Sequence, residues 1–324
     1  MIPLAIPFPV EAPYQVKADL KRIEEDDFST QWLWRDAQLT QYLNGKLASL
    51  ANQALCPWLV KESAFETNVI DVLIARLAWV NPDLFVRIND TAWQFIYLGL
   101  QCDQAGNVHI SRLLNTIEAR CVQWLLFQKK AHRLWHCLAL SLQEDFALMH
   151  KTEHGFIAEA LHVCFPSGWS PQTKFTQDLS QIHEPVADGD RLRASTKPLS
   201  IAMVNKGPFV RYVWTLCSGD HLSEHPHLKA QRAAASPYQA GATVFFRCER
   251  QVTIPFAEHS RSLFLIRVFS ANLEQVIDNK DRATTLIAAI ESMTPASKQY
   301  KAIEAFVPQT LLVCQAALAS GDSA

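Results

Sequence analysis

The stretch LHVCFPSGWSPQTKFTQDLSQIHEPV, residues 161–186, is where the interpretation of this sequence begins. Its first apolar run ends at Phe165, and the Pro-Ser-Gly triplet that follows is expected to stop a strand. The prolines at 171 and 185 bracket a short helix, because neither can lie inside a regular helix. His183 then falls at the end of that helix, where an imidazole can interact with the helix dipole or serve as an axial ligand of haem iron. The spacing leaves both roles open.

The residues around this stretch predict a β-rich central unit. Short runs of β-branched and aromatic residues, separated by turn signals, predict a hairpin over 146–165 and strands over 209–217, 242–254 and 261–270. The helical segment after the hairpin gives the order strand, strand, helices, strand, strand, strand. That is the order of a PAS unit, and we expect the unit to span about 141–270.

The flanking regions read differently. The first 27 residues are rich in proline and then charged, so an irregular arm is expected there. Apolar residues at spacings of three and four predict mainly helix up to residue 140, although 84–110 alternates more, which predicts strands or a helix break there. We therefore expect an α+β protein in three parts: an N-terminal arm and helical region at 1–140, the PAS-like core at 141–270, and C-terminal helices packing on the core at 271–324.

The composition excludes several classes of protein. The chain has 324 residues, 49% of them apolar, and a net charge of −2, which argues against a nucleic-acid-binding footprint. No signal peptide or membrane span is expected, because the start is interrupted by proline and the apolar runs are short. The eight cysteines are dispersed without C-x-x-C pairs, as is typical of reduced core residues in a cytoplasmic protein.

Six sequence blocks, in order along the chain, resemble the haem-dependent oxidative N-demethylase family, to which the haem subunit of dimethylamine monooxygenase belongs. The main block is CFPSGWSP, then Lys174, then IHEPV. The others are LQEDFALM at 142–149, Arg211-Tyr212-Val213-Trp214, Phe246-Arg247-Cys248-Glu249-Arg250-Gln251, Leu263-Phe264-Leu265-Ile266-Arg267 and Tyr300-Lys301. The sequence departs from the family pattern at Val213, where an asparagine is usual, at Phe175-Thr176-Gln177 and at Val252-Thr253.

The resemblance implies a haem-binding PAS-like antiparallel sheet and an oxygenase reaction. The implied reaction is oxidative N-demethylation of a small secondary or tertiary amine, using dioxygen and electrons from a separate reductase subunit. Non-covalent haem b is expected, because no C-x-x-C-H motif is present. NADPH, flavin and an iron–sulfur cluster are expected on the partner reductase, since this chain has no G-x-G-x-x-G pattern. A haem-based gas or redox sensor, a degenerate member without catalysis, and a homo-oligomer all stay open.

The resemblance also suggests roles for seven residues. His183 is the expected axial ligand of the iron; the expected catalytic residues are Glu249, Trp214 and Arg211, and the expected cofactor-binding residues are Arg250, Arg267 and Lys174. Strand alternation, however, directs Trp214 away from Arg211, and Arg250 away from Glu249. For Glu249 two roles are open, anchoring an arginine or contacting the substrate ammonium, and we favour the second.

Other histidines compete with His183 for the iron. His221, His225 and His227 form an H-x-x-x-H-x-H pattern in the polar segment 218–240, which could hold a metal but is read as a solvated loop. A second set could pack in the core or edge a haem pocket: His132, His136, His150, His154 and His162. For His132 and His136, one helical turn apart, core or interface packing is favoured.

Overall fold

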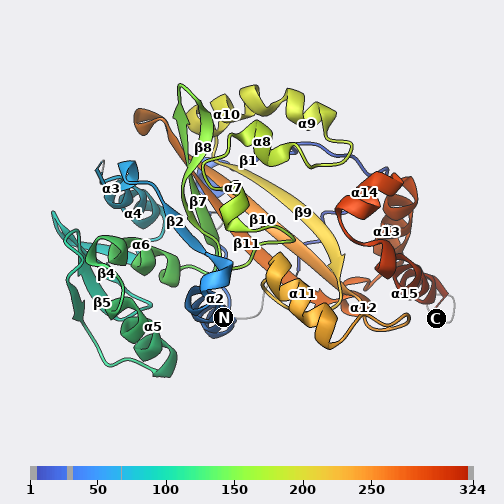
Figure 1. Cartoon of the computed structure of the whole chain (residues 1–324), viewed down its shortest axis with the longest axis horizontal. Coiled ribbons are helices and arrows are strands. Elements are labelled where there is room, and N and C mark those ends of the chain that lie inside the picture. Colours follow the sequence, from blue (N-terminus) through green and yellow to red (C-terminus); the bar gives the residue numbers. More distant parts are fainter. Residues whose placement is uncertain (1–5, 28–31, 67, 320–324) are drawn as a thin grey trace.

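The computed structural model describes residues 6–27, 32–66 and 68–319, and it centres on one antiparallel sheet of seven strands (Figure 1). In spatial order these strands are β1 (Lys21–Arg22), β9 (Phe209–Cys217), β10 (Phe245–Phe256), β11 (Arg261–Asn272), β7 (Asp145–Thr152), β8 (Gly155–His162) and β2 (Trp58–Val60). The mixed helix and antiparallel sheet confirm the predicted α+β class.

Five of these strands follow the order predicted from the sequence. The β7–β8 hairpin comes first, helices follow, and β9, β10 and β11 complete the sheet. The intervening helices are α7 (Pro171–Lys174), α8 (Leu179–His183), α9 (Asp190–Ala194) and α10 (Thr196–Asn205). The expected single helix over 170–184 is therefore two short ones, divided by Thr176 in the left-handed region at φ +66°. The expected polar loop at 218–240 contains the helix α11 (Pro226–Ala235).

The register of β9 and β10 divides their side chains between two faces. Gln251 pairs with Arg211, and Glu249 pairs with Val213, so these four residues lie on one face. We call this the front face, and the opposite one, on which Trp214 stacks against Phe246, the rear face. Apolar residues of α8 and α10 pack against the hairpin end of the front face, as Leu179 does.

Two groups of helices cover the rear face. The N-terminal group contains α2 (Leu39–Ala51), α3 (Ser63–Glu66), α4 (Val69–Val80), α5 (Thr116–Leu126) and α6 (Lys130–Ser141), and its apolar residues share a core with β7, β10 and β11. The C-terminal group contains α12 (Leu273–Val276), α13 (Lys280–Ser292), α14 (Pro295–Tyr300) and α15 (Val307–Ala319). It forms a second core with β9, β10 and the N-terminal arm.

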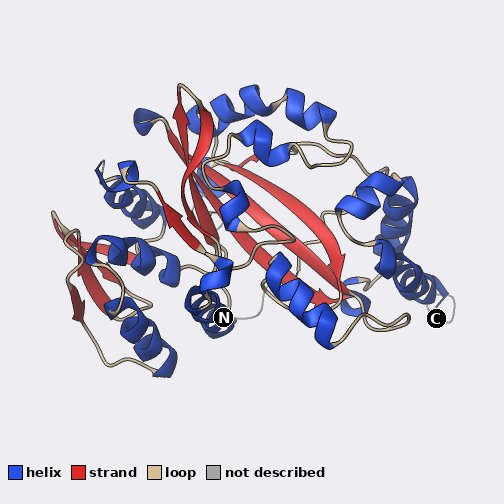
Figure 2. Ribbon diagram, viewed as in Figure 1, coloured by secondary structure: helices blue, strands red, loops and turns tan. Residues whose placement is uncertain are grey.

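The N-terminal region is less helical than predicted. A four-stranded antiparallel sheet lies within it, formed by β3 (Phe85–Asn89), β4 (Ala92–Phe95), β5 (Leu100–Asp103) and β6 (Val108–Ile110) (Figure 2). The alternation noted at 84–110 reflects these strands, which are too short to have given a stronger signal. Because β1 and β2 also join the central sheet, the first 140 residues contribute both of its edges. The boundaries of the three-part layout stay a prediction.

The N-terminal arm has little regular structure, but its aromatic side chains pack against the sheet. The Phe8 ring stacks on Phe246 with centroids 5.5 Å apart, and Tyr14 meets Trp214 edge-on at 6.3 Å.

All eight cysteines are free thiols, and all but Cys56 are buried. Within the described parts of the chain, no helix combines the length and apolar character needed to cross a bilayer.

Candidate functional site

His183 has the hydrogen bonding of a histidine prepared to bind a metal. Its helix α8 starts at a capping box made by Asp178 and Gln181 and ends at His183 itself, which is half-buried. The ring Nδ1 lies 2.8 Å from the carbonyl oxygen of Leu179. A carbonyl can only accept a hydrogen bond, so Nδ1 carries the proton and Nε2 keeps its lone pair. Metal-binding histidines commonly use this arrangement to fix the ring and its tautomer.

The surroundings of His183 also keep its ring neutral. Burial lowers the pKa of His183, and the nearby charges of Arg211 and Lys174 lower it further, while the bond to Leu179 opposes them. The ring is therefore unprotonated at neutral pH, as ligation requires. The predicted partner Lys174 lies at the same site, where its Nζ donates to the carbonyl oxygen of Ile182 at 3.1 Å.

His225 shows the opposite tautomer. Its Nδ1 accepts a hydrogen bond from the backbone N–H of His227 at 3.2 Å, where it caps the start of α11. In the neutral ring the proton is therefore on Nε2, which is buried and has no hydrogen-bond partner in the described chain. His221 and His227 are exposed, and the described residues contain no group of three or more suitable side chains that could hold a metal ion. Of the three loop histidines, His225 therefore serves as the cap of α11.

Of the remaining histidine rivals, His154 is exposed and His150 lies 3.2 Å from Glu159, whereas the other three pack together. His136 and His162 are 1% and 0% exposed, and Nδ1 of the first lies 3.2 Å from Nε2 of the second. Trp58 donates to His132 at 3.1 Å and packs against all three imidazoles. Burial lowers the pKa of His136 to about 3. The expectation of packing for His132 and His136 is confirmed, and His162 lies in their cluster rather than beside His183.

The sheet beside His183 presents a carboxylate and a guanidinium. Glu249 is 8% exposed, and its Oε2 accepts a hydrogen bond from Gln251 at 2.7 Å. Burial lowers the pKa of Arg211, and the charge of Glu249 opposes this shift. The Nε of Arg211 is buried without a hydrogen-bond partner among the described residues. These two predicted residues therefore lie together with His183 and Lys174 on the front face.

Lys301 lies at the edge of β9 beside this site, and the sequence did not predict it there. It follows α14, and its Nζ donates to the carbonyl oxygen of Trp214. The same ammonium lies 4.9 Å from the Trp214 ring centroid and 5.3 Å from that of Tyr14. Burial lowers the pKa of Lys301 to about 8; Glu249 opposes that shift and Arg211 adds to it. The Tyr300-Lys301 pair was visible as a family block, but nothing in the sequence placed it beside β9.

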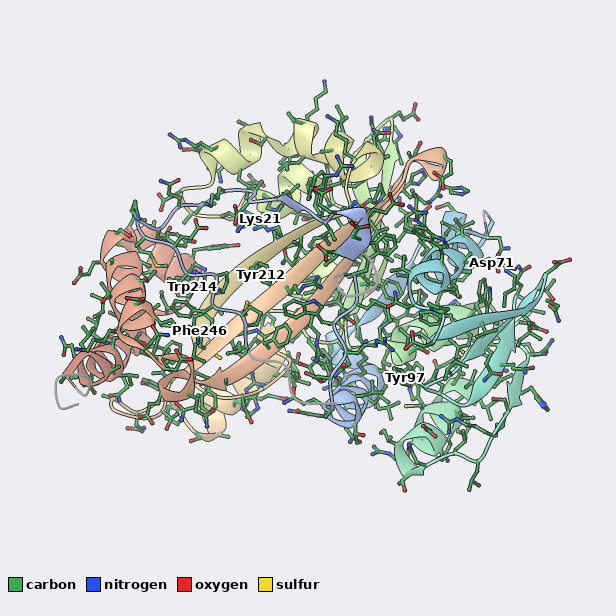
Figure 3. All side chains as sticks on the ribbon, turned by 180° about the vertical axis from the view of Figure 1, so that it is seen from behind. Lys21, Asp71, Tyr97, Tyr212, Trp214 and Phe246 are labelled. Carbon is green, nitrogen blue, oxygen red and sulfur yellow. The ribbon has the colours of Figure 1, made fainter. Side chains whose placement is uncertain are left out.

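Three predicted site residues lie on the other face of the sheet. Trp214 is 5% exposed and stacks on Phe246 (Figure 3). The guanidinium of Arg250 lies 4.3 Å from the Trp34 ring centroid. Arg267 contacts Asp36 at 3.2 Å.

One ligand bound against His183 cannot also lie against these three side chains, because the sheet intervenes. We therefore correct the expectation that Trp214, Arg250 and Arg267 belong to the same site as His183. Strand alternation in the sequence already predicted this separation for Trp214 and Arg250.

Two of the sequence blocks have structural roles beside the site. Arg247 is 1% exposed and donates to Ser167 Oγ and to the carbonyl oxygens of Phe165, His221 and Leu222. It thereby fixes the loop that leads into α7.

The LQED segment holds the chain that precedes α2. Gln143 bonds both the backbone and the side chain of Asp36, and Glu144 accepts from the backbone N–H of Trp34. These bonds place Trp34 and Asp36 against the arginines of the rear face.

A comparison with known protein families assigns this chain to a family. The sequence model of the haem-dependent oxidative N-demethylase, alpha subunit-like, family matches residues 24–311. This chain belongs to that family. The N-demethylase resemblance in the six sequence blocks is therefore confirmed, and with it a haem-dependent oxidative enzyme family.

The residues of the front face fit the haem that the family name implies. His183 offers a neutral Nε2 with its lone pair free, which is what an axial imidazole needs. The charges of Lys174 and Arg211 act on this imidazole and are both positive, and haem brings two negatively charged propionates. The donor set and the charge therefore both match the group.

Proposed function

We propose that this protein uses haem to remove a methyl group oxidatively from a small secondary or tertiary amine, with dioxygen and with electrons from a separate reductase subunit. The single observation that carries the proposal is His183: a neutral, half-buried imidazole whose Nδ1 is fixed by Leu179, on a basic face, in a chain of the N-demethylase family. Haem bound there would supply an iron that activates dioxygen.

The protein's own contribution begins with the orientation of His183. The Leu179 carbonyl holds the Nδ1 proton, so the ring presents Nε2 in one direction and cannot rotate without losing that bond. Lys174 and Arg211 keep the ring from becoming an imidazolium, because a third positive charge beside them is unfavourable. We propose that Lys174 also lies against the edge of the bound group.

For Glu249 the geometry supports the first of its two roles. Gln251 already donates to the Glu249 carboxylate, and the charges of Arg211 and Lys301 lie close enough to be stabilised by it. An ammonium substrate would meet those two cations as well as the carboxylate. We therefore propose that Glu249 is a positioning residue, which holds its basic neighbours charged and in place, and that the amine binds elsewhere on the front face.

Several finer features belong to the same proposal. We propose that the bound group is haem b, held without a covalent bond, and that the five-strand core with its inserted helices is PAS-like, because its elements follow that order. NADPH, flavin and an iron–sulfur cluster would then be carried by the reductase. The family's description as an alpha subunit supports a partner subunit of this kind.

The proposal is tested by reconstitution of the purified chain with haem b. We expect a Soret band after removal of excess haem, and formaldehyde release that requires amine, NADPH and an added reductase together. Haem binding without amine-dependent turnover would instead favour a gas or redox sensor. A chain that retains no haem would contradict the proposed function altogether.

A further inference from the structure

Arg211 is a half-buried cation whose Nε is buried without a hydrogen-bond partner among the described residues. In the described parts of the chain its side chain makes neither a hydrogen bond nor an ion pair, and its Nε is shielded from solvent. Arg261, in comparison, donates twice to Glu159, at 2.6 and 2.9 Å, and Arg247 donates to four oxygens. Since buried polar groups in proteins are almost always paired, an arginine left without a partner requires an explanation.

Lys301 lies beside it with donors to spare. An ammonium has three N–H donors, and the described chain engages one of them, at the carbonyl oxygen of Trp214. The rings of Tyr14 and Trp214 lie against the same ammonium and offer it no further acceptor on those sides. Lys301 is anchored at Trp214, three residues along β9 from Arg211, and the charge of Arg211 lowers the pKa of Lys301.

Glu249 does not neutralise this pair. Its Oε2 is taken by Gln251, and no ion pair within 4.0 Å joins it to Arg211 or Lys301 in the part of the chain that the structure describes. Glu249 and Asp19 are the carboxylates whose charges act on Arg211, and Lys174 adds a third positive charge on the His183 side. Uncompensated buried charge is costly, so an additional anion at this place would be stabilising.

We propose that Arg211 and Lys301 together form a carboxylate-binding site at the β9 edge of the front face, where Lys301 reaches the strand through Trp214 and Thr215. The guanidinium offers its fork of donors and the ammonium offers its two unused ones, so that both contribute charge-assisted hydrogen bonds to one carboxylate. The inference rests on the proposed function in one respect: the carboxylate can be a haem propionate. A small free carboxylate has the same chemistry and is the other source.

A comparison of two ligands tests the propionate source. Haem b and its dimethyl ester differ only in the charge of the propionates. We expect the wild-type protein to bind haem b about 10- to 100-fold more tightly than the ester, as for charge-assisted hydrogen bonds. In Arg211→Gln and in Lys301→Gln this preference should fall to about twofold while ester affinity is retained. Lys298→Gln, which removes a positive charge from the same helix, is the matched control and should keep the full preference.

A second measurement tests the site without haem. Acylation of Lys301 in the haem-free full-length chain is followed by mass spectrometry, with and without succinate. We expect succinate to protect Lys301 in the wild type but not in Arg211→Gln. Once haem b is bound, succinate should add no protection if a propionate occupies the site. If it still protects Lys301, the free carboxylate is the source.

These outcomes separate the inference from the function on which it rests. Failure to bind either porphyrin would overturn the proposed function, and the succinate measurement would still decide the carboxylate site. Equal affinities of the wild type for haem b and its ester, together with no protection by succinate, would overturn the carboxylate site itself. Variants that kept the wild-type preference would show that other side chains hold the propionates.

Discussion

The arginines on the front and rear faces of β9–β11 differ in their protein partners. On the rear face Arg267 contacts the Asp36 carboxylate and lies 3.7 Å from the Tyr42 ring centroid, and Arg250 lies against Trp34. On the front face Arg211 has neither a carboxylate within ion-pair distance nor a ring against it in the described chain. We infer that a buried arginine with protein partners stabilises the fold, whereas the half-buried Arg211, without them, marks the place of a ligand.

The largest effect expected from this comparison concerns folding stability. Arg267→Ala leaves the Asp36 carboxylate, which is 1% exposed, without its cation, and should lower the free energy of unfolding by about 3–5 kcal/mol. Arg211→Gln should change it far less, because no protein partner is lost. Denaturant unfolding of both haem-free variants measures the difference. Similar losses in the two would mean that Arg211 is also a structural residue.

The next effect is the pH dependence of haem binding. Lys301 has a pKa near 8 in the folded chain, below its ordinary value of 10.5. It therefore loses its proton as pH rises through about 8, and the affinity for haem b should fall there. Glu249 opposes this lowering, so Glu249→Gln should move the fall to lower pH.

The fall in haem b affinity, and its shift in Glu249→Gln, are measured by haem titrations from pH 6 to 10. The dimethyl ester is the control ligand. The ester should show no such fall. In the same Glu249→Gln variant, amine affinity per bound haem should equal that of the wild type. A weakened amine affinity would restore the substrate role that the sequence favoured.

Folding stability of the haem-free protein should change with pH in the opposite direction to haem affinity, and should rise as Lys301 loses its proton. Because its folded pKa lies below the unfolded one, the folded chain releases this proton first, and the Lys301 contribution to the stability of the haem-free protein rises between about pH 8 and pH 10.5. Lys301→Gln should remove that contribution. Thermal unfolding across this range, compared between variant and wild type, measures it. A variant with an unchanged pH slope would mean that Lys301 keeps an ordinary pKa.

The smallest effect concerns a clamp between the two sides of the site. Asp188 lies in the loop after α8, and its Oδ2 accepts from Thr294 and Ser297 at 2.6 Å each, at the start of the helix that leads to Lys301. Asp188→Ala should speed amide exchange in residues 184–190 and weaken haem binding slightly. Asp188→Asn keeps an acceptor and tolerates the φ of +56°, so it is the control. Equal exchange in both variants and the wild type would argue against the clamp.

Local patterns in the sequence were enough to predict the central part of the fold. The prolines at 171 and 185 and the aromatic and β-branched runs gave the hairpin, the three later strands and the place of His183 on a short helix. The sequence did not clearly predict the four-stranded sheet at 85–110 or the helix α11, because very short strands and polar helices leave only a weak periodicity of apolar residues.

The site was predictable only in part, because it is assembled by tertiary contacts. His183, Arg211 and Glu249 come together as the blocks suggested, and alternation correctly separated Trp214 and Arg250 from them. The position of Lys301 depends on how the C-terminal helices dock beside β9, for which no local pattern exists. The tautomer of His183 likewise depends on one hydrogen bond that only the folded α8 supplies.

The most direct test of the account is the ferric haem spectrum of His183→Ala beside that of His225→Ala. Both variants remove a histidine near the front-face loops, but only His183 has the tautomer of a metal ligand. We predict that His183→Ala loses haem or the imidazole-ligated spectrum, that added imidazole restores the spectrum, and that His225→Ala keeps it. An unchanged spectrum in His183→Ala, or its loss in His225→Ala alone, would contradict the assignment of the front face as the haem site.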